Sequence, residues 1–411
     1  MLQYILNDLK KSKLIVTALW LGYGASYFIR TCYAASINSI VNERIYTKGE
    51  VGLIGTAFFI CYGVGQLISG LVGDRVNPFA MVFFGLFAGS VSCFAMAFAD
   101  NLPLMLIIWA LNGLFQSMLW SPILRIFSET IDKSLSKKSI LNISLSLPVG
   151  TVCAYLASTL IIKYSNYKYV FICGGICILI SAIFLIFTIV YIKNDLSLVK
   201  KQKEIKQKSE GKSSFFSLAV ASGLFVIIIP SFLHGMMRDG ITNWVPTMIT
   251  ETYGVSPSFS VFLTVALPIF NAFGAYAVVP LYKKLHYNEM KAAAVTGLIA
   301  VVPILLLLLN GKLPVLVIII LLALTTSIMY ALNYLIISLV PVRFVKYSCT
   351  STVSGVLNSA AHIGCAVSSY GFGAISQKAG WNVVILLWLV STVLIFLSSL
   401  SVSRKWNKMI S

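Results

Sequence analysis

Acidic residues are scarce in this 411-residue chain, which has 13 Asp and Glu against 31 Lys and Arg. Charged residues of both signs make up only 11% of the sequence, whereas hydrophobic residues make up 58%. Mean hydropathy is +0.90, which a soluble globule cannot accommodate. The composition therefore excludes a water-soluble protein and favours an integral membrane protein.

The chain also lacks the motifs of several functional classes. It has no G-x-x-x-x-G-K-[ST] sequence and no polar stretch long enough for a nucleotide-binding domain, which argues against ATP-driven transport. No nucleophile–base pair or cluster of metal ligands stands out, so we expect neither an enzyme nor a bound cofactor or metal. The eight cysteines all lie in apolar stretches, where they act as small hydrophobic residues and predict no disulfide framework.

Long apolar runs follow one another along almost the whole chain. A membrane-spanning helix needs about 20 mostly apolar residues, and a backbone in lipid satisfies its hydrogen bonds within a helix. We therefore expect an all-α membrane protein of twelve spanning helices, near residues 14–40, 50–73, 79–99, 104–127, 139–162, 169–192, 215–248, 258–282, 290–309, 314–340, 348–376 and 381–402.

The net charge of +18 follows the predicted topology rather than a basic binding face. If the amino terminus is cytoplasmic, 23 of the 31 Lys and Arg residues fall on the cytoplasmic side, and 6 fall in the loops of the other side. This asymmetry is the positive-inside pattern, and it predicts a multi-pass protein of the cell membrane with both termini in the cytoplasm. We expect no nucleic-acid partner.

The longest polar interruption, residues 193–214, contains seven lysines and no aromatic residue. Such a segment is typical of a flexible cytoplasmic linker. It separates six predicted spans in residues 1–192 from six in residues 215–411. We therefore expect two pseudo-symmetric six-helix halves.

Two arginines lie inside apolar stretches, Arg30 within residues 14–40 and Arg238 within residues 215–248. A charged side chain at the bilayer centre costs about 2.5–3.5 kcal/mol on insertion scales, so such a residue marks a functional site. Asp239 is the only acid well inside a predicted span. The sequence therefore predicts that an anionic cargo supplies the missing counter-charge.

Several residues near the two arginines are further candidates. Tyr23, Tyr27 and Arg30 are spaced i, i+4, i+7, which places them on one helix face, where phenolic hydroxyls can donate to an oxyanion. The alternative is that the tyrosines only pack. His234 precedes Arg238 by four residues and shares its face, as either a titratable donor or an interhelical hydrogen-bonding group.

Asp239 follows Arg238 directly. Neighbouring residues on a helix point about 100° apart, so we expect no simple ion pair between them. Asp239 is then expected either to pair with a polar group of another helix or to serve as a proton-linked carboxylate.

Four stretches carry a family resemblance. Residues 69–78 read SGLVGDRVNP, which includes Gly73, Asp74 and Arg75 and resembles the glycine–x–x–x–Asp–Arg pattern of a known loop signature. Residues 22–30 read GYGASYFIR, residues 109–122 read WALNGLFQSMLWSP, and residues 238–247 read RDGITNWVPT. Together these resemble the organophosphate:phosphate antiporter family of the major facilitator superfamily, which includes glycerol-phosphate and hexose-phosphate carriers.

The resemblance implies a major facilitator fold in which Arg30 and Arg238 bind a substrate phosphoryl group from the two halves of one central cavity. It places Tyr23 and Tyr27 nearby and gives the loop at Gly73, Asp74 and Arg75 a role in latching neighbouring helices at the cytoplasmic face.

The chain also departs from the family pattern. The family commonly has a second-span lysine where this sequence has Gln66, which we count with Tyr62 among the candidate binding residues. In the seventh span, Asp239 and Asn243 replace an aromatic residue and an acid.

The sequence thus predicts a secondary transporter of a small organic anion, a phosphorylated metabolite exchanged for inorganic phosphate by alternating access. Exchange is favoured because an empty site with two unneutralised arginines is expected to change conformation slowly. One alternative is a proton-coupled exporter of drugs or carboxylates that uses Asp239 or His234, and another is a non-transporting membrane sensor. The expected partners are the small anion and the lipid bilayer, with the monomer as the functional unit.

Overall fold

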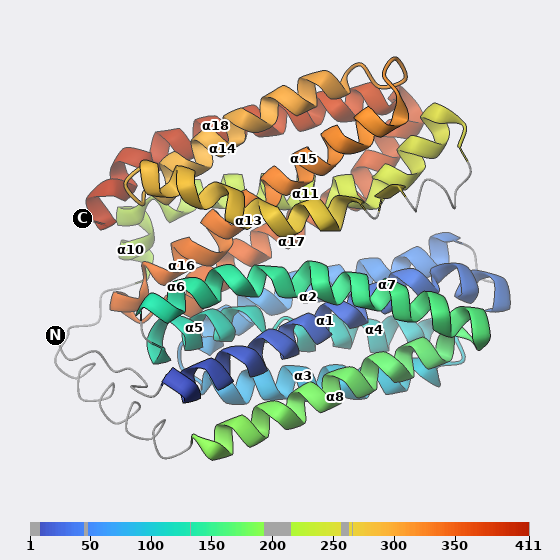
Figure 1. Ribbon diagram of the computed structural model, residues 1–411, viewed down its shortest axis with the longest axis horizontal. Helices are drawn as coiled ribbons and strands as arrows, with labels where there is room; N and C mark the ends of the chain where they lie inside the picture. Colours follow the sequence, from blue (N-terminus) through green and yellow to red (C-terminus); the bar gives the residue numbers. More distant parts are fainter. Residues whose placement is uncertain are drawn as a thin grey trace. The chain divides into compact units, whose positions relative to one another are not determined.

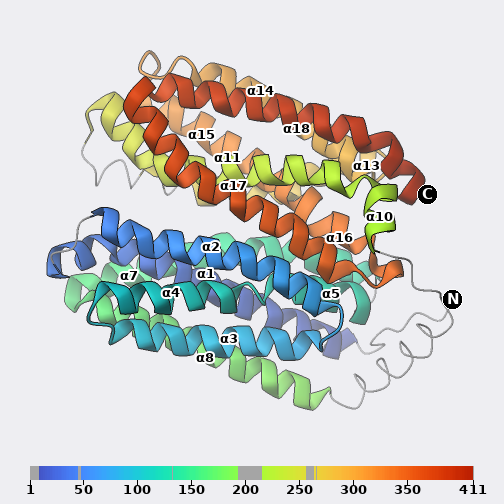
Figure 2. The same cartoon turned by 180° about the vertical axis from the view of Figure 1, so that it is seen from behind.

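Long helices form nearly all of the described chain (Figures 1 and 2). The computed structural model describes residues 9–44, 48–131, 133–192, 215–255, 263–264 and 266–410. The chain divides into two compact units, residues 1–213 with 344–355 and residues 214–343 with 356–411. The predicted linker, residues 193–214, lies outside the described residues, so its boundaries stay a prediction.

The first unit consists of helices that run side by side along a common direction (Figure 2). They are α1 (Leu9–Arg44), α2 (Lys48–Gly73), α3 (Pro78–Ala97), α4 (Leu102–Gln116), α5 (Trp120–Thr130), α6 (Lys133–Asn142), the 3₁₀ turn η1 (Ile143–Leu145), α7 (Ser146–Tyr164) and α8 (Tyr167–Tyr191). The 3₁₀ turn η3 (Val345–Tyr347) and the start of α17 (Thr350–Ala379) also belong to this unit.

The second unit contains the remaining helices. They are α10 (Phe215–Ser222), α11 (Leu224–Tyr253), α13 (Ala266–Lys284), α14 (Glu289–Leu307), α15 (Val315–Asn333), the π-helical turn η2 (Tyr334–Leu339), α16 (Val340–Val342), the rest of α17, and α18 (Trp381–Ile410). The helix α17 is thus the element that the two units share.

Among the described residues, nine helical stretches are long and apolar enough to cross a membrane. The other three predicted spans coincide with α1, α13 and α17, which carry more polar residues. In the described part of the chain, four predicted spans are interrupted. The seventh divides into α10 and α11 at Gly223, which has a positive φ, and the other three break near prolines. The fourth divides into α4 and α5 just before Pro122, the fifth contains a 3₁₀ turn before Pro148, and the tenth contains η2 before Pro341. Proline removes a backbone donor and clashes with the preceding turn, which explains the breaks near it.

The two units repeat one packing pattern. In the first, α2 packs on α4, α3 on α8, and α1 on α7 and α8. In the second, α13 packs on α15, α14 on α18, and α11 on α18. Close helix approach at glycine recurs as well, since a side chain on Gly150 of α7 would meet the Gly24 carbonyl of α1, and one on Gly235 of α11 would meet Ala361 of α17. Small residues permit such approach in membrane bundles.

Candidate functional site

The Arg30 guanidinium in the first unit is surrounded by aromatic rings. Its Cζ atom lies 4.2 Å from the ring centroid of Tyr62, 4.7 Å from that of Tyr27 and 5.6 Å from that of Phe58. A cation over an aromatic face is attracted by the ring quadrupole. Within the described residues, Arg30 forms no ion pair with a carboxylate, and its buried Nη2 atom has no hydrogen-bond partner.

One amide orients this guanidinium. Arg30 Nε donates to Gln116 Oε1 over 2.9 Å, and Gln116 Nε2 donates to Asn112 Oδ1 over 2.5 Å. Asn112 in turn donates to the hydroxyl of Ser92 over 3.1 Å. This chain of hydrogen bonds fixes the acceptor end of Gln116 toward Arg30. Asn112 and Gln116 belong to the stretch 109–122 that carries the family resemblance, but they were not predicted in the site. Their i, i+4 spacing on one helix was the available signal.

The predicted shared face of α1 is confirmed in its geometry. The hydroxyls of Tyr23 and Tyr27 lie 3.3 Å apart, and Tyr27 contacts Arg30. The Tyr23 ring is buried and lies 5.1 Å from the ring of Trp120. Both tyrosines therefore already have neighbours in the packed unit, and their contact with an anion stays a prediction.

The candidates on α2 occupy two successive turns. Tyr62 is buried against Arg30, whereas Gln66 is fully buried and accepts a hydrogen bond from the Ser121 hydroxyl over 3.4 Å. The Nε2 atom of Gln66 has no partner among the described residues. Tyr62 thus joins the surroundings of Arg30, whereas the side-chain contact described for Gln66 is with Ser121.

Arg238 in the second unit is already paired with its neighbour. Its Nε and Nη2 atoms donate to the two carboxylate oxygens of Asp239 over 2.8 and 2.6 Å, and the two side chains form an ion pair. The prediction that no such pair would form was wrong. The 100° separation along the helix is bridged because the long arginine side chain folds back and presents two parallel donors to both carboxylate oxygens.

The rest of the Arg238 environment is polar. Arg238 Nη1 donates to Asn333 Oδ1 over 2.8 Å, and His234 Nε2 lies 3.2 Å from the same oxygen. The predicted common face of His234 and Arg238 is therefore confirmed, with Asn333 as their shared partner. The Tyr330 ring lies 5.6 Å from the Arg238 Cζ atom. Asn333 and Tyr330 were not among the candidate binding residues, because a single amide or tyrosine in an apolar run carries no signal of its own.

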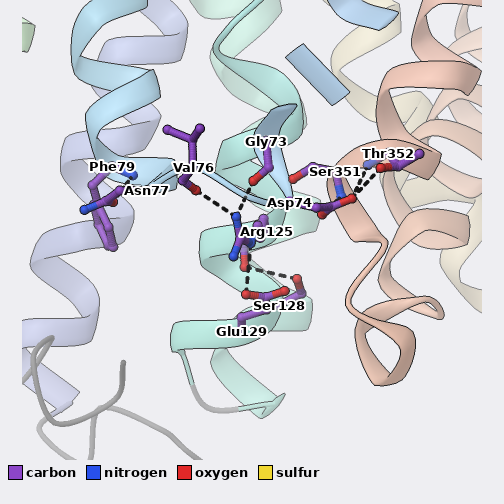
Figure 3. Close-up of polar contacts among 10 residues, drawn as sticks. All are labelled: Gly73, Asp74, Val76, Asn77, Phe79, Arg125, Ser128, Glu129, Ser351 and Thr352. Carbon is purple, nitrogen blue, oxygen red and sulfur yellow. Dashed lines mark hydrogen bonds and ion pairs between the residues drawn. The ribbon is translucent and has the colours of Figure 1, made fainter. Parts of the chain in front are cut away.

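The loop after α2 forms a polar cluster with α5 and the start of α17 (Figure 3). The Asp74 carboxylate accepts from the backbone amides of Ser351 and Thr352 over 2.9 and 2.8 Å, and from the Thr352 hydroxyl over 2.5 Å. It thereby caps the N-terminus of α17, where free amides and the helix dipole favour an anion. Burial raises the pKa of Asp74, and the bonds from Thr352 and Ser351 oppose that rise.

The arginine in this cluster is not the one in the signature. The Arg75 side chain is exposed, whereas Arg125 of α5 donates to the carbonyls of Gly73 and Val76 and pairs with Glu129 at 3.1 Å (Figure 3). A comparable cluster in the second unit centres on Glu289, which accepts from Arg343, Tyr282 and Trp406 over 2.7, 2.6 and 2.8 Å. Arg125, Arg343 and Glu289 were not predicted from the sequence, because most of their partners lie far along the chain.

Comparison with known proteins places this geometry in a family. Residues 19–369 match the profile described as Major Facilitator Superfamily. The chain belongs to that superfamily. The predicted major facilitator fold is thereby confirmed, and this major facilitator protein is a multi-pass membrane protein.

Its relatives include carriers of phosphate esters. The chain is 27% identical to the glycerol-3-phosphate transporter of Bacillus subtilis over 269 residues, which cover 60% of this chain and 59% of that one. It is 27% identical over 170 residues to the "Probable hexose phosphate transport protein" of Chlamydia trachomatis, covering 41% and 37%. It is 37% identical over 102 residues to the membrane sensor protein UhpC of Salmonella typhimurium, covering 25% and 23%. The match thus spans less than two thirds of each relative, and the resemblance to organophosphate carriers is confirmed.

Solved structures agree on the fold. The proton:xylose symporter XylE superposes with a TM-score of 0.78 at 11% identity, covering 98% of this chain and 96% of that one. FucP in its outward conformation gives a TM-score of 0.66 at 16% identity, covering 93% and 98%. At these identities the likeness establishes the shared fold alone.

Proposed function

We propose that this major facilitator protein is a secondary transporter of a small organic anion that carries a phosphoryl group, exchanged for inorganic phosphate by alternating access. Residues 1–192 and 215–411 form its two halves, and both termini lie in the cytoplasm. The protein works as a monomer and has no enzymatic step. The names of its relatives support a phosphorylated cargo, because two of the three are transporters of phosphate esters.

The surroundings of Arg30 carry this proposal. A permanent cation buried in a membrane-spanning helix needs a counter-anion, and the described residues give Arg30 three aromatic rings and one amide oxygen instead. Guanidinium offers planar, paired donors that match phosphoryl oxygens, and its Nη2 atom has no protein partner in the described part of the chain. A phosphoryl oxygen can take that place.

Exchange follows from the same charge. An empty carrier must move the uncompensated Arg30 through its conformational change, whereas a bound anion neutralises it, so the loaded form is expected to switch faster. The sequence alone left two arginines without a counter-charge, but in the structure Arg238 has Asp239 as its counter-charge. The argument for exchange therefore depends on Arg30 alone.

Counterflow in proteoliposomes tests the proposal. Vesicles loaded with unlabelled phosphate should accumulate labelled phosphate, and vesicles without an internal anion should not. Arg30→Gln should abolish the uptake, and Arg30→Lys should lower it by about tenfold or more, because lysine keeps the charge and loses the paired donors. Arg404→Gln, which removes an exposed arginine of α18, should transport as the wild type does. Uptake that is independent of an internal anion, or unchanged in Arg30→Gln, contradicts the proposal.

A membrane sensor is the second candidate, favoured by the 37% identity to the UhpC sensor over 102 residues. A sensor binds its anion at Arg30 without moving it across the membrane. Calorimetric binding of phosphate that is lost in Arg30→Gln, together with no counterflow in vesicles, would support the sensor over the transporter.

A further inference from the structure

Buried N–H donors without a hydrogen-bond partner gather in one part of the first unit. Arg30 Nη2, Gln66 Nε2 and Trp120 Nε1 are each buried and have no partner among the described residues. The side chains of Gln66 and Trp120 lie in residues that are 0% and 3% exposed. An indole N–H and an amide NH₂ group can only donate, and buried donors are normally paired. These three donors therefore call for an acceptor that the described side chains do not supply.

A series of aromatic contacts joins the first of these donors to the last. The Tyr27 ring contacts the Arg30 guanidinium, with 4.7 Å between the ring centroid and Cζ. The hydroxyls of Tyr27 and Tyr23 lie 3.3 Å apart. The Tyr23 ring in turn lies 5.1 Å from the ring of Trp120. Arg30 and Trp120 are thus separated by two tyrosines of α1.

A second series of contacts reaches Trp120 through α2. The Tyr62 ring contacts Arg30, and Gln66 follows Tyr62 by one helical turn, which is a rise of about 6 Å. The Ser121 hydroxyl donates to Gln66 Oε1 over 3.4 Å, so the acceptor end of this amide is used and its donor end is left. Ser121 follows Trp120 directly at the start of α5. The two series therefore enclose one region of the first unit.

The backbone of the fourth span is interrupted at this region. The helix α4 ends at Gln116 and α5 begins at Trp120. Gln116, before the break, contacts Arg30, and Ser121, after it, contacts Gln66. Non-helical backbone at membrane depth is tolerated where protein buries it or where it lines a cavity, and interrupted helices form the substrate sites of many carriers. The break thus lies between the charged donor and the two uncharged ones.

We propose that Trp120 and Gln66 bind a neutral oxygen in the organic part of the cargo, while Arg30 binds the phosphoryl group. This rests on the proposed function, in which Arg30 receives the phosphoryl oxygens. Neither Trp120 nor Gln66 adds charge, so this pair distinguishes cargoes by a hydroxyl, ether or carbonyl oxygen and not by their ionisation. Because Gln66 lies one turn beyond the ring that contacts Arg30, the oxygen is expected about two or three carbons from the ester oxygen of the phosphate.

Matched phosphate esters test the inference. 2-Hydroxyethyl phosphate and propyl phosphate have the same charge and nearly the same size, and differ by a hydroxyl in place of a methyl group. 3-Hydroxypropyl phosphate and butyl phosphate form a longer pair of the same kind. Calorimetry on the purified wild type should show at least about fivefold tighter binding of the hydroxylated ester in one pair or in both, which is the effect of one or two hydrogen bonds.

Trp120→Phe removes the indole N–H and keeps an aromatic ring against Tyr23. The preference for the hydroxylated ester should fall to about twofold or less. The affinity for the alkyl ester of the same pair should change by less than about threefold, because that ester has no oxygen for the N–H to bind. A variant that only disturbed packing would weaken both esters alike and leave the preference as it was.

A second variant and a matched control complete the test. Gln66→Met keeps the length of the side chain and removes the free donor, so it should also lower the preference by about twofold or more, and it decides the matter if Trp120→Phe does not fold. Trp388 of α18 is also buried, and its Nε1 atom has no partner among the described residues. It packs against Phe372 in the second unit, so Trp388→Phe should keep the wild-type preference.

The outcomes separate this inference from the proposed function. Equal affinities within both pairs in the wild type, or a preference that neither Trp120→Phe nor Gln66→Met lowers, would overturn the inference. If the wild type binds none of the esters, or Arg30→Gln binds them as tightly, the proposed function fails and the inference falls with it. If Arg30→Gln loses the esters while the other two variants keep the preference, only the roles of Trp120 and Gln66 are wrong.

Discussion

At the scale of single residues, the neighbours of a buried charge decide its use. Arg30 and Arg238 look equivalent in sequence, since each lies deep in the first span of its half. In the structure one contacts an amide and aromatic rings, and the other binds a carboxylate. Because an arginine cannot lose its proton to escape burial, the atom opposite the guanidinium determines whether an external anion has a place there.

A single isosteric substitution at Gln116 can give Arg30 the same kind of partner that Arg238 has. Gln116→Glu places a carboxylate against Arg30 at the position of the present 2.9 Å contact, so Arg30 gains the internal counter-anion that Arg238 already has. Phosphate affinity, measured by calorimetry, should fall by about tenfold or more.

Gln116→Met is the matched control for this change. It removes the acceptor but leaves the charge of Arg30 available, so it should reduce affinity less than Gln116→Glu does. Equal losses in the two variants would show that the amide itself, rather than the charge of Arg30, governs binding.

At the scale of helices, the loop after α2 holds the start of α17 through one carboxylate. Asp74 accepts three hydrogen bonds from Ser351 and Thr352, and nearby α2 and α17 touch at Gly70 and Gly355, where a side chain on Gly70 would come within 2.7 Å of the Gly355 Cα atom. A polar cap and a backbone contact therefore dock the same end of α17.

Removal of the Asp74 acceptor should destabilise the protein. Asp74→Ala leaves two backbone amides and one hydroxyl without their acceptor, which should lower the free energy of unfolding by about 1–3 kcal/mol. The midpoint of thermal unfolding in detergent should therefore fall by several degrees. Asp74→Asn should cost less than half as much, because it keeps one acceptor and because burial, which raises the pKa of Asp74, already penalises the ionised form.

Asp100→Ala, at an aspartate whose side chain is 75% exposed, should leave the midpoint unchanged. If Asp74→Asn is as damaging as Asp74→Ala, the negative charge rather than the acceptor holds α17.

The positions of the helices could be predicted from the sequence, whereas only some of the contacts between their side chains could. Apolar runs of about 20 residues locate the spans because lipid demands them, and i, i+4 spacing placed Tyr27 beside Tyr23 and His234 beside Arg238. The cluster at Glu289 was not predicted because it depends on side chains from other parts of the chain, Tyr282, Arg343 and Trp406. The prediction that Arg238 would not pair with Asp239 failed for a different reason. Helix geometry constrains the directions of the Cβ atoms but leaves a long side chain free to fold back.

At the scale of the whole molecule, the distribution of positive charge predicts how the protein lies in the membrane. Lys and Arg residues of short loops are retained in the cytoplasm during insertion, and 23 of 31 lie on the side that the even-numbered loops share with the termini. The loops of α14 distinguish the two sides well. Lys284 precedes this helix and Lys312 follows it, and both side chains are exposed.

Cysteine labelling checks this topology. In a variant without the eight native cysteines, Lys312→Cys should react with an impermeant maleimide on intact cells, and Lys284→Cys should react only after permeabilisation. The reverse result would place both termini outside. Because the helix between the two positions spans 19 residues, Glu289–Leu307, and a span needs about 20, labelling of both sites on intact cells would mean that α14 does not cross the bilayer. Either outcome would contradict the attribution of the net charge of +18 to the positive-inside pattern, because the basic loops would lie on the outer face in the first case and would no longer share one face of the membrane in the second.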